Sequence, residues 1–436
     1  MDWVKKLGMS HKKSIFMVAG EASGDLHGSS VVREIFKRDP SVFMYGVGGI
    51  EMEKAGVHLI ARSETLAVTG IFEVFFKLKQ LLSLFFLLVR SIIIYKPDLA
   101  ILIDSPDFNL RLAKRLKKRG VPVLYYISPQ VWAWRRSRLR QIRKCVTRML
   151  VVFPFESAFY KAAGVDVDFV GHPLLDRLPD CPLVSENVRT IALMPGSRKN
   201  EVRYLLPAML ESVRQIHRRY PAIEFRLVLA PMLRLSDISF TTDESLPIKI
   251  IEGGDPDFLS GVDFVICCSG TATLEAAILG KAMVVLYKLN RLTYFLVTFL
   301  MTSGLKYFAL PNLIASRRLV PELLQGDVTP QKISEEVFRF LENRELLKQT
   351  SRELLKIRNQ LGSPGAASRV AEQAFLFLAN GHPERNESHP AIRKTLGFFL
   401  LKLTHRIFSP FLWLASCLYG FAVWGRRYFY VVKIFK

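Results

Sequence analysis

The chain has 436 residues, half of them apolar, and a formal net charge of +22. It is long enough for two α/β domains and an additional segment. Its five cysteines lack the spacing of a metal site, which argues against a zinc protein and for a reducing compartment. The polar, basic residues 1–13 lead into a short apolar run and predict no signal peptide.

The positive charge is concentrated in two segments. Residues 135–148 contain seven Lys or Arg, and residues 391–436 contain eight and no acidic residue. Either nucleic acid or an anionic membrane with phosphorylated substrates would suit such segments. The basic residues stand beside Phe, Leu, Trp and Ile runs, which favours the membrane and disfavours nucleic acid.

The first predicted strand, Ser14–Ala19, runs into a glycine-spaced turn over residues 20–28. Glu21, Asp25 and His27 in this turn are candidates for acid–base chemistry or substrate contact. Asp25 is equally suited to capping a helix, and His27 to packing in the core. The spacing is not that of a dinucleotide-binding loop.

Residues 71–95 bring many large apolar side chains together, flanked by cations. The uncharged part is too short to span a bilayer, so the segment is either a buried helix or a helix with a lipid-facing side. The abundance of Phe and the cationic flanks favour lipid contact, and the candidate residues are Phe72, Phe75 and Phe85.

A clean buried strand, Leu99–Ile103, is followed directly by Asp104. Ligands of parallel α/β sheets bind at the carboxyl ends of strands, so Asp104 is a candidate general base. Asp107 has the position of a helix cap. An ordinary turn and cap remain the alternative for both residues.

The next predicted strand, Val121–Ser128, leads to two tryptophans beside arginines, Trp132 and Trp134. They are candidates for gripping a phosphate and an acyl chain together, and the alternative is the solvated face of a basic helix. Prolines 173, 179 and 182 then mark a linker.

The second half repeats the pattern of strand, small-residue turn and helix, which predicts a second doubly wound sheet. Predicted strands cover residues 190–194, 224–230, 248–251, 264–267 and 283–286. Two turns are candidate phosphate sites, one at Ser197 and Arg198 and one at Ser269, Gly270 and Thr271, where a helix begins. Glu275 is placed to bind a ribose, and Asn312 to reach a sugar hydroxyl or phosphate. Simple helix–sheet packing is the alternative explanation for the small residues.

A polar linker over residues 381–390 precedes an uncharged run, Ile407–Trp424, with basic residues on both sides. This length is marginal for a membrane span. A monotopic anchor is at least as good an interpretation as a transmembrane helix, and charge gives no orientation.

Eight motifs in fixed order resemble lipid A disaccharide synthase over residues 13–380. They are Gly20-Glu-Ala-Ser-Gly-Asp25, Asp104-Ser-Pro-Asp-Phe-Asn109, Ser128-Pro-Gln-Val-Trp-Ala-Trp134, Phe153-Pro-Phe-Glu156, Gly171-His-Pro173, Pro195-Gly-Ser-Arg198, Ser269-Gly-Thr-Ala-Thr-Leu-Glu275 and Leu310-Pro-Asn-Leu313. Eight ordered motifs are far more specific than any one of them. Residues 391–436 instead look similar to the membrane anchor of tetraacyldisaccharide 4′-kinase, without a kinase phosphate loop.

The resemblance implies an α/β enzyme of GT-B architecture, with two Rossmann-like domains facing across a cleft and a basic, apolar, membrane-associating tail. The implied ranges are 13–175 for the acceptor domain, 188–360 for the nucleotide-sugar domain, 361–380 for a C-terminal helix region and 391–436 for the tail. The implied reaction joins UDP-2,3-diacylglucosamine to 2,3-diacylglucosamine 1-phosphate (lipid X) with inversion, giving a β(1→6) disaccharide and UDP in the lipopolysaccharide pathway of Gram-negative bacteria.

The family's general base falls on Asp104, its phosphate-contacting arginine on Arg198 and its functional asparagine on Asn312. The UDP site of related GT-B enzymes falls on Ser269, Gly270, Thr271 and Glu275. We expect no cofactor, no metal and no nucleic acid, a peripheral or monotopic place on the cytoplasmic face of the inner membrane, and leave a homodimer open. The rival hypotheses are a UDP-N-acetylglucosamine 2-epimerase and a non-catalytic nucleic-acid-binding protein.

Overall fold

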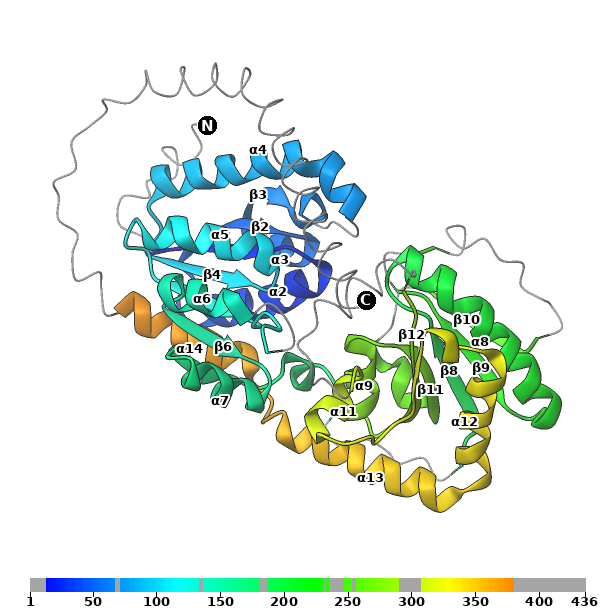
Figure 1. Ribbon diagram of the computed structural model, residues 1–436. Helices are drawn as coiled ribbons and strands as arrows, with labels where there is room; N and C mark the ends of the chain where they lie inside the picture. Colours follow the sequence, from blue (N-terminus) through cyan, green and yellow to red (C-terminus); the bar gives the residue numbers. More distant parts are fainter. Residues whose placement is uncertain are drawn as a thin grey trace, which may run out of the picture. The chain divides into compact units, whose positions relative to one another are not determined.

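The computed structural model describes residues 13–66, 71–132, 136–179, 187–230, 233–234, 246–252, 256–289 and 307–379 (Figure 1), with only the backbone for 71–78 and 256–257. The described residues lie within one compact unit, residues 1–382, which contains two sheets. The predictions for the tail at 391–436 therefore lie outside the described residues.

The first sheet, within the described ranges, has seven parallel strands in the order β3-β2-β1-β4-β5-β6-β7. Its strands are β1 (Ser14–Ala19), β2 (Phe43–Gly48), β3 (His58–Arg62), β4 (Leu99–Ile103), β5 (Val123–Tyr126), β6 (Arg148–Val151) and β7 (Val167–Phe169). Its helices are α2 (Ala22–Arg38), α3 (Ile50–Lys54), α4 (Ile71–Tyr95), α5 (Pro106–Lys117), α6 (Leu139–Cys145) and α7 (Pro154–Ala162). Helices connect parallel strands here as the sequence pattern predicts.

Side chains alternate between the two faces of this sheet, and both faces are covered. On β1, Phe16 and Val18 pack in the core that contains Leu84 and Leu88 of α4. Ile15 and Met17 of β1 pack in the core beneath α2. Because both faces of the sheet are buried, strands such as β4 consist almost entirely of apolar residues.

The second sheet has six parallel strands in the described part of the chain, in the order β10-β9-β8-β11-β12-β13. Its strands are β8 (Thr190–Met194), β9 (Glu224–Val228), β10 (Ile248–Ile251), β11 (Phe264–Cys268), β12 (Ala282–Tyr287) and β13 (Glu322–Leu324). Its helices are α8 (Lys199–Arg219), α9 (Thr271–Ile278), α11 (Leu310–Ala315), α12 (Pro330–Glu342) and α13 (Arg344–Gln360). α8 and α12 cover one face of this sheet, and α9 and α13 cover the other.

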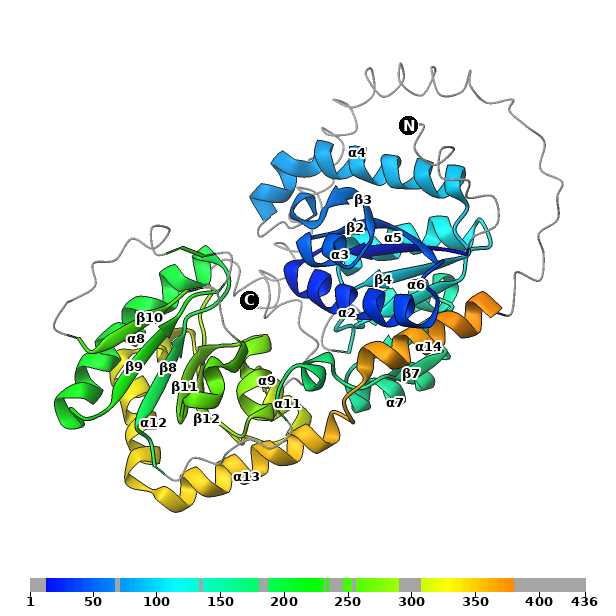
Figure 2. The ribbon, with the colours of Figure 1, turned by 180° about the vertical axis from the view of Figure 1, so that it is seen from behind.

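The chain then returns to the first sheet through α14 (Ala366–Ala379), which packs beside α2 (Figure 2). The carboxylate of Asp176 accepts hydrogen bonds from the N–H groups of Gly365, Ala366 and Ala367, at 2.5, 3.2 and 3.3 Å. A carboxylate in this position satisfies the unpaired donors at a helix start. The segment after β7 therefore anchors the first turn of the last described helix.

Arg369 of α14 ties the same two segments together. Its guanidinium donates to the carbonyls of Val170, Ser363 and Pro364, at 2.8, 2.6 and 2.9 Å. Of these three residues only Val170 is buried, so its carbonyl has no access to replacement water.

Arg369→Ala is expected to lower the free energy of unfolding by about 1–3 kcal/mol, the cost of leaving a buried carbonyl unpaired. Urea denaturation followed by circular dichroism measures this change. Arg352→Ala, at an exposed position of α13, is the matched control and should change stability by less than about 0.5 kcal/mol. Equal stability of the two variants would show that Arg369 does not hold the segments together.

Candidate active site

Strand order reverses once in each sheet, and most of the candidate residues lie at these reversals. The first sheet reverses between β1 and β4, and the second between β8 and β11. Ligands of open parallel sheets bind beyond the carboxyl ends of the strands at such points. Glu21 and Asp104 follow β1 and β4, while Arg198 and Ser269 follow β8 and β11.

The turn that carries Asp104 has an unusual backbone. Asp104 and Ser105 have φ angles of 48° and 44°, in the left-handed region that costs a non-glycine residue about 1–3 kcal/mol. The neighbouring loop comes very close, because a Cβ atom at Gly20 would lie 2.1 Å from the Ser105 hydroxyl oxygen. Strain and close approach of this kind are concentrated at functional sites.

The surroundings of Asp104 suit a general base. Burial, with a smaller contribution from the nearby Glu21 carboxylate, raises the pKa of Asp104 to about 6, against a hydrogen bond from the Ser105 backbone. A carboxyl with this pKa is mostly ionised near neutral pH and is a stronger base than an exposed one. Glu21 itself is exposed and does not cap α2 with its side chain.

Asp25 caps a helix, although not the one that contains it, whereas Asp107 does not have the cap role predicted for it. The Asp25 carboxylate accepts from the N–H groups of Gly49, Glu51 and Met52, at 2.6, 3.0 and 3.0 Å, so it anchors the start of α3. Asp107 is not the cap of its helix. Ser105 holds the cap position of α5, and Asp107 pairs with Arg138.

His27 is buried and faces the segment after β7. Burial lowers the pKa of His27 to about 4, helped by Arg177 and opposed by Asp176. The ring is therefore neutral at physiological pH and cannot serve as a cationic anchor for phosphate.

In the second domain, the loop after β8 presents Arg198 at the start of α8. Its side chain is 54% exposed and lies 3.6 Å from the Glu201 carboxylate. Glu201 also accepts from the N–H groups of Ser197 and Arg198, at 3.0 and 3.2 Å. The N–H groups of Ser197 and Arg198 are thus bonded to Glu201, so an anion would meet the exposed guanidinium, which is itself within ion-pair distance of Glu201.

The loop after β11 is more open. A Cβ atom at Gly270 would meet no heavy atom within 4 Å, so a ligand can approach this backbone closely. Gly270 caps α9, whose first N–H groups begin at the exposed Thr271. Burial raises the pKa of Glu275, one turn further on, while Arg177 lowers it. The helix start, with its partial positive charge, suits a phosphate group.

Asn312 is fully buried, and its amide makes four hydrogen bonds inside the protein. The nitrogen donates to the Val320 carbonyl at 2.9 Å and to Glu322 at 2.7 Å, and the oxygen accepts from Leu319 and Val320. No donor or acceptor remains to reach a sugar or a phosphate. In this structure Asn312 shapes the chain and does not contact the site directly.

Glu322 is a residue that sequence reasoning missed. Besides Asn312, its carboxylate accepts from the N–H groups of Phe308 and Ala309, both at 3.0 Å. The Phe308 carbonyl in turn accepts from the Ser269 hydroxyl at 3.3 Å. Asn312 and Glu322 therefore support the loop beside the candidate phosphate site, and no periodicity or spacing signals such a role.

Glu156 ends one of the eight motifs, but sequence reasoning gave it no role. It is almost fully buried and accepts from the Ser128 hydroxyl at 2.5 Å and from the Trp132 indole N–H at 3.2 Å. Burial raises the pKa of Glu156 to about 7, against the hydrogen bond from Ser128. This carboxyl holds the loop of Trp132. Trp134 lies outside the described residues.

The apolar helix α4 does have an exposed apolar face, but Phe85 is not on it. Phe85 is partly buried and packs edge-to-face on Phe108, with ring centroids 5.9 Å apart. The exposed face carries Leu82, Phe86, Leu87, Ile93 and Ile94. Phe85 is therefore not on the exposed face of α4, where its neighbour Phe86 lies instead, and the side chains of Phe72 and Phe75 lie outside the described residues.

The described residues also bear on metal binding, the state of the cysteines and membrane-spanning helices. No cluster of potential metal ligands occurs among the described residues. Cys145, Cys267 and Cys268 are buried free thiols. Within the same ranges, no helix is both long enough and apolar enough to cross a membrane.

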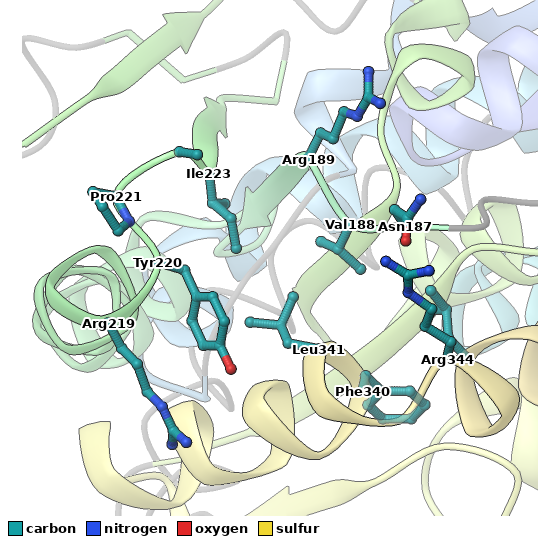
Figure 3. Close-up of a pocket in the computed structure, with 12 residues that line it drawn as sticks. Asn187, Val188, Arg189, Arg219, Tyr220, Pro221, Ile223, Phe340, Leu341 and Arg344 are labelled. Carbon is teal, nitrogen blue, oxygen red and sulfur yellow. The ribbon is translucent and has the colours of Figure 1, made fainter.

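A cavity of about 320 Å³ lies away from these residues, where β8 and β9 begin (Figure 3). Its lining combines an apolar floor with arginines, and includes Val188, Arg189, Arg219, Tyr220, Leu341 and Arg344. Because it is at the amino end of the sheet, it is not part of the candidate active site.

Solved structures with this fold include nucleotide-sugar enzymes. The UDP-GlcNAc 2-epimerase from Neisseria meningitidis bound to UDP-GlcNAc is similar with a TM-score of 0.58 at 14% identity, covering 83% of this chain and 100% of that one. The glycotransferase of kitacinnamycin gives 0.56 at 16% identity, covering 84% and 100%. At these identities the likeness shows a two-domain GT-B-like fold and does not decide between epimerase and transferase.

Sequence comparison decides the family. The family model for lipid-A-disaccharide synthetase matches residues 15–375. Lipid-A-disaccharide synthase of Syntrophus aciditrophicus is 43% identical over 382 residues, covering 84% of this chain and 98% of the relative. That of Geobacter metallireducens is 41% identical over 375 residues, covering 84% and 97%. The chain therefore belongs to the lipid-A-disaccharide synthetase family of glycosyltransferases.

Proposed function

We propose that the protein joins UDP-2,3-diacylglucosamine to 2,3-diacylglucosamine 1-phosphate, forming the β(1→6) disaccharide 1-phosphate and UDP. The 43% identity to a lipid-A-disaccharide synthase over nearly the whole relative carries the proposal. The raised pKa of Asp104 at the first switch point adds a suitable base, with burial as its main cause.

In the proposed step Asp104 takes the proton from the 6-hydroxyl of the acceptor. The oxygen attacks the anomeric carbon from the side opposite the UDP group, the carbon–oxygen bond to the diphosphate breaks, and the configuration inverts. Arg198 and the first N–H groups of α9 stabilise the negative charge that develops on UDP. With this charge supplied by the chain, we expect no requirement for a divalent cation.

The test is an incubation with labelled UDP-diacylglucosamine, with and without the acyl-sugar phosphate, in buffer and in EDTA. UDP release that requires the acceptor and persists in EDTA supports the proposal. Isomerisation of the sugar without acceptor would instead indicate an epimerase, and no reaction in either case would indicate a binding protein. Loss of turnover in EDTA alone would remove the metal-free mechanism.

Asp104→Asn is expected to lower turnover by about 10²–10⁴-fold, because an amide cannot accept the proton. Binding of UDP, measured by calorimetry, should stay within about twofold, since the nucleotide residues lie in the second domain. Asp107→Asn, an exposed carboxyl in the same segment, is the control and should keep near-normal turnover. Normal turnover in Asp104→Asn would rule out this base.

The pH dependence of kcat/KM, which reports ionisation in the free enzyme, should show the same carboxyl. Asp104 must be ionised to accept a proton, so activity should rise with pH through the value near 6 that burial and Glu21 give its pKa. Glu21→Gln removes the negative charge that raises this pKa, so the midpoint should move to lower pH. A midpoint that is unchanged in Glu21→Gln, or one near 4 in the wild type, would contradict this assignment.

We also propose that the enzyme works at the cytoplasmic face of the inner membrane, with α4 touching lipid. The support is the exposed apolar face of α4, on which Phe86 is 57% exposed, together with the exposed cations Lys79 and Arg90 on the same helix. Apolar side chains beside cations suit an interface with anionic lipid. The tail at 391–436 would provide a second attachment, since one marginal contact exchanges readily with solution.

A double variant, Phe86→Ser with Leu87→Ser, is expected to weaken binding to anionic vesicles by about tenfold or more. Use of acylated acceptor should fall in parallel. The melting temperature should change little because both side chains are exposed. Co-sedimentation and calorimetry measure these quantities.

The matched control is Leu376→Ser, at a leucine of α14 that is 48% exposed on the other side of the first sheet. It should leave vesicle binding unchanged. If the α4 variant binds vesicles normally, the lipid contact is elsewhere. If it melts early, Phe86 and Leu87 stabilise the fold and the loss of vesicle binding is not evidence for lipid contact.

A further inference from the structure

The main-chain carbonyl of Asp104 is held from two directions. The hydroxyl of Tyr125, on the neighbouring strand β5, donates to it at 2.5 Å. The side-chain amide of Asn109, on α5, donates to it at 2.8 Å and also to the carbonyl of Ile103 at 3.0 Å. The Asp104 N–H continues the sheet and donates to the carbonyl of Tyr126 at 3.1 Å. Both peptide groups that flank the Asp104 carboxylate are therefore fixed.

These hydrogen bonds stabilise a strained stretch of backbone. Asp104 and Ser105 both have left-handed backbone angles, which persist only where the surroundings impose them. If the Asp104 carbonyl were released, rotation of its peptide plane would move the Cα atom and the carboxylate with it. A displacement of about 1 Å is enough to cost a reaction about a hundredfold.

The chemistry of Tyr125 suits this role and no catalytic one. Its side chain is fully buried, and burial raises the pKa of its hydroxyl well above the usual value, as do the charges of Asp104 and the nearby Tyr160. The hydroxyl therefore keeps its proton at every working pH. Since that proton is given to the Asp104 carbonyl, Tyr125 does not donate to substrate.

We propose that Tyr125, together with Asn109, is a positioning residue that holds the general base in its strained turn. The inference rests on the proposed role of Asp104. Its alternative is an ordinary core tyrosine whose hydroxyl happens to meet the nearest acceptor.

Tyr125→Phe tests the inference by removing one oxygen atom and keeping the ring. We expect kcat to fall by about tenfold to a hundredfold with KM for both substrates within about twofold, because binding groups are untouched while the base moves. Tyr126→Phe is the matched control. Tyr126 is adjacent on β5, equally buried, packs on the opposite face of the sheet, and its hydroxyl has no hydrogen-bond partner among the described residues. It should keep normal kcat.

A second arm uses Asp104→Asn as the background. If Tyr125 acts through the Asp104 carboxylate, Tyr125→Phe should cause no further loss of turnover once the carboxylate is gone. Equal fold-losses in both backgrounds, or normal kcat in the single Tyr125→Phe variant, would overturn the inference. Normal turnover of Asp104→Asn alone would instead overturn the proposed base, so the two failures are distinguishable.

Discussion

The close approach of two loops at the first switch point sets the geometry on which the site depends. Parallel order brings the ends of β1 and β4 to one edge, and Gly20 meets Ser105 so tightly that only a hydrogen atom fits. The chain beyond β4 therefore turns sharply, through left-handed angles at Asp104 and Ser105. That turn keeps the carboxylate of Asp104 partly buried beside Glu21, and burial in turn raises its pKa.

The two sheets repeat one topology with opposite electrostatics. At the first switch point the loops present carboxylates, Glu21 and Asp104, which suit removal of a proton. At the second they present Arg198 and the start of α9, which suit a diphosphate. The same topology thus provides a base for the alcohol in one domain and a diphosphate site for the nucleotide sugar in the other. In each domain a supporting residue, Tyr125 or Glu322, hydrogen-bonds to backbone atoms beside the site.

The local sequence pattern predicted most helices and strands correctly, but it did not predict which way individual side chains point. The strands at 99–103 and 190–194 have the predicted bounds, because apolar runs between turn residues mark buried parallel strands. Phe85 is partly buried and Phe86 exposed, because neighbouring residues on a helix point about 100° apart and an apolar run with no polar face does not show which side is buried. Asn312, Glu156 and Glu322 depend on partners distant in sequence or on tertiary burial, which spacing cannot reveal. Strand ends and small-residue turns already indicated Asp104, Arg198 and the turn at 269–271, and the family motifs added the substrates and the reaction.

The return of α14 to the first sheet has a consequence for the order in which the protein is made. Synthesis proceeds from the amino end, and domains generally fold as they emerge from the ribosome. Here the face of α2 that α14 covers stays open until residue 379 has been translated, long after β7 is complete. The first domain must therefore wait, partly uncovered, while the second domain is made and folds. During that interval its apolar surface is a natural substrate for chaperones, and a ribosome stalled before α14 would leave an aggregation-prone fragment.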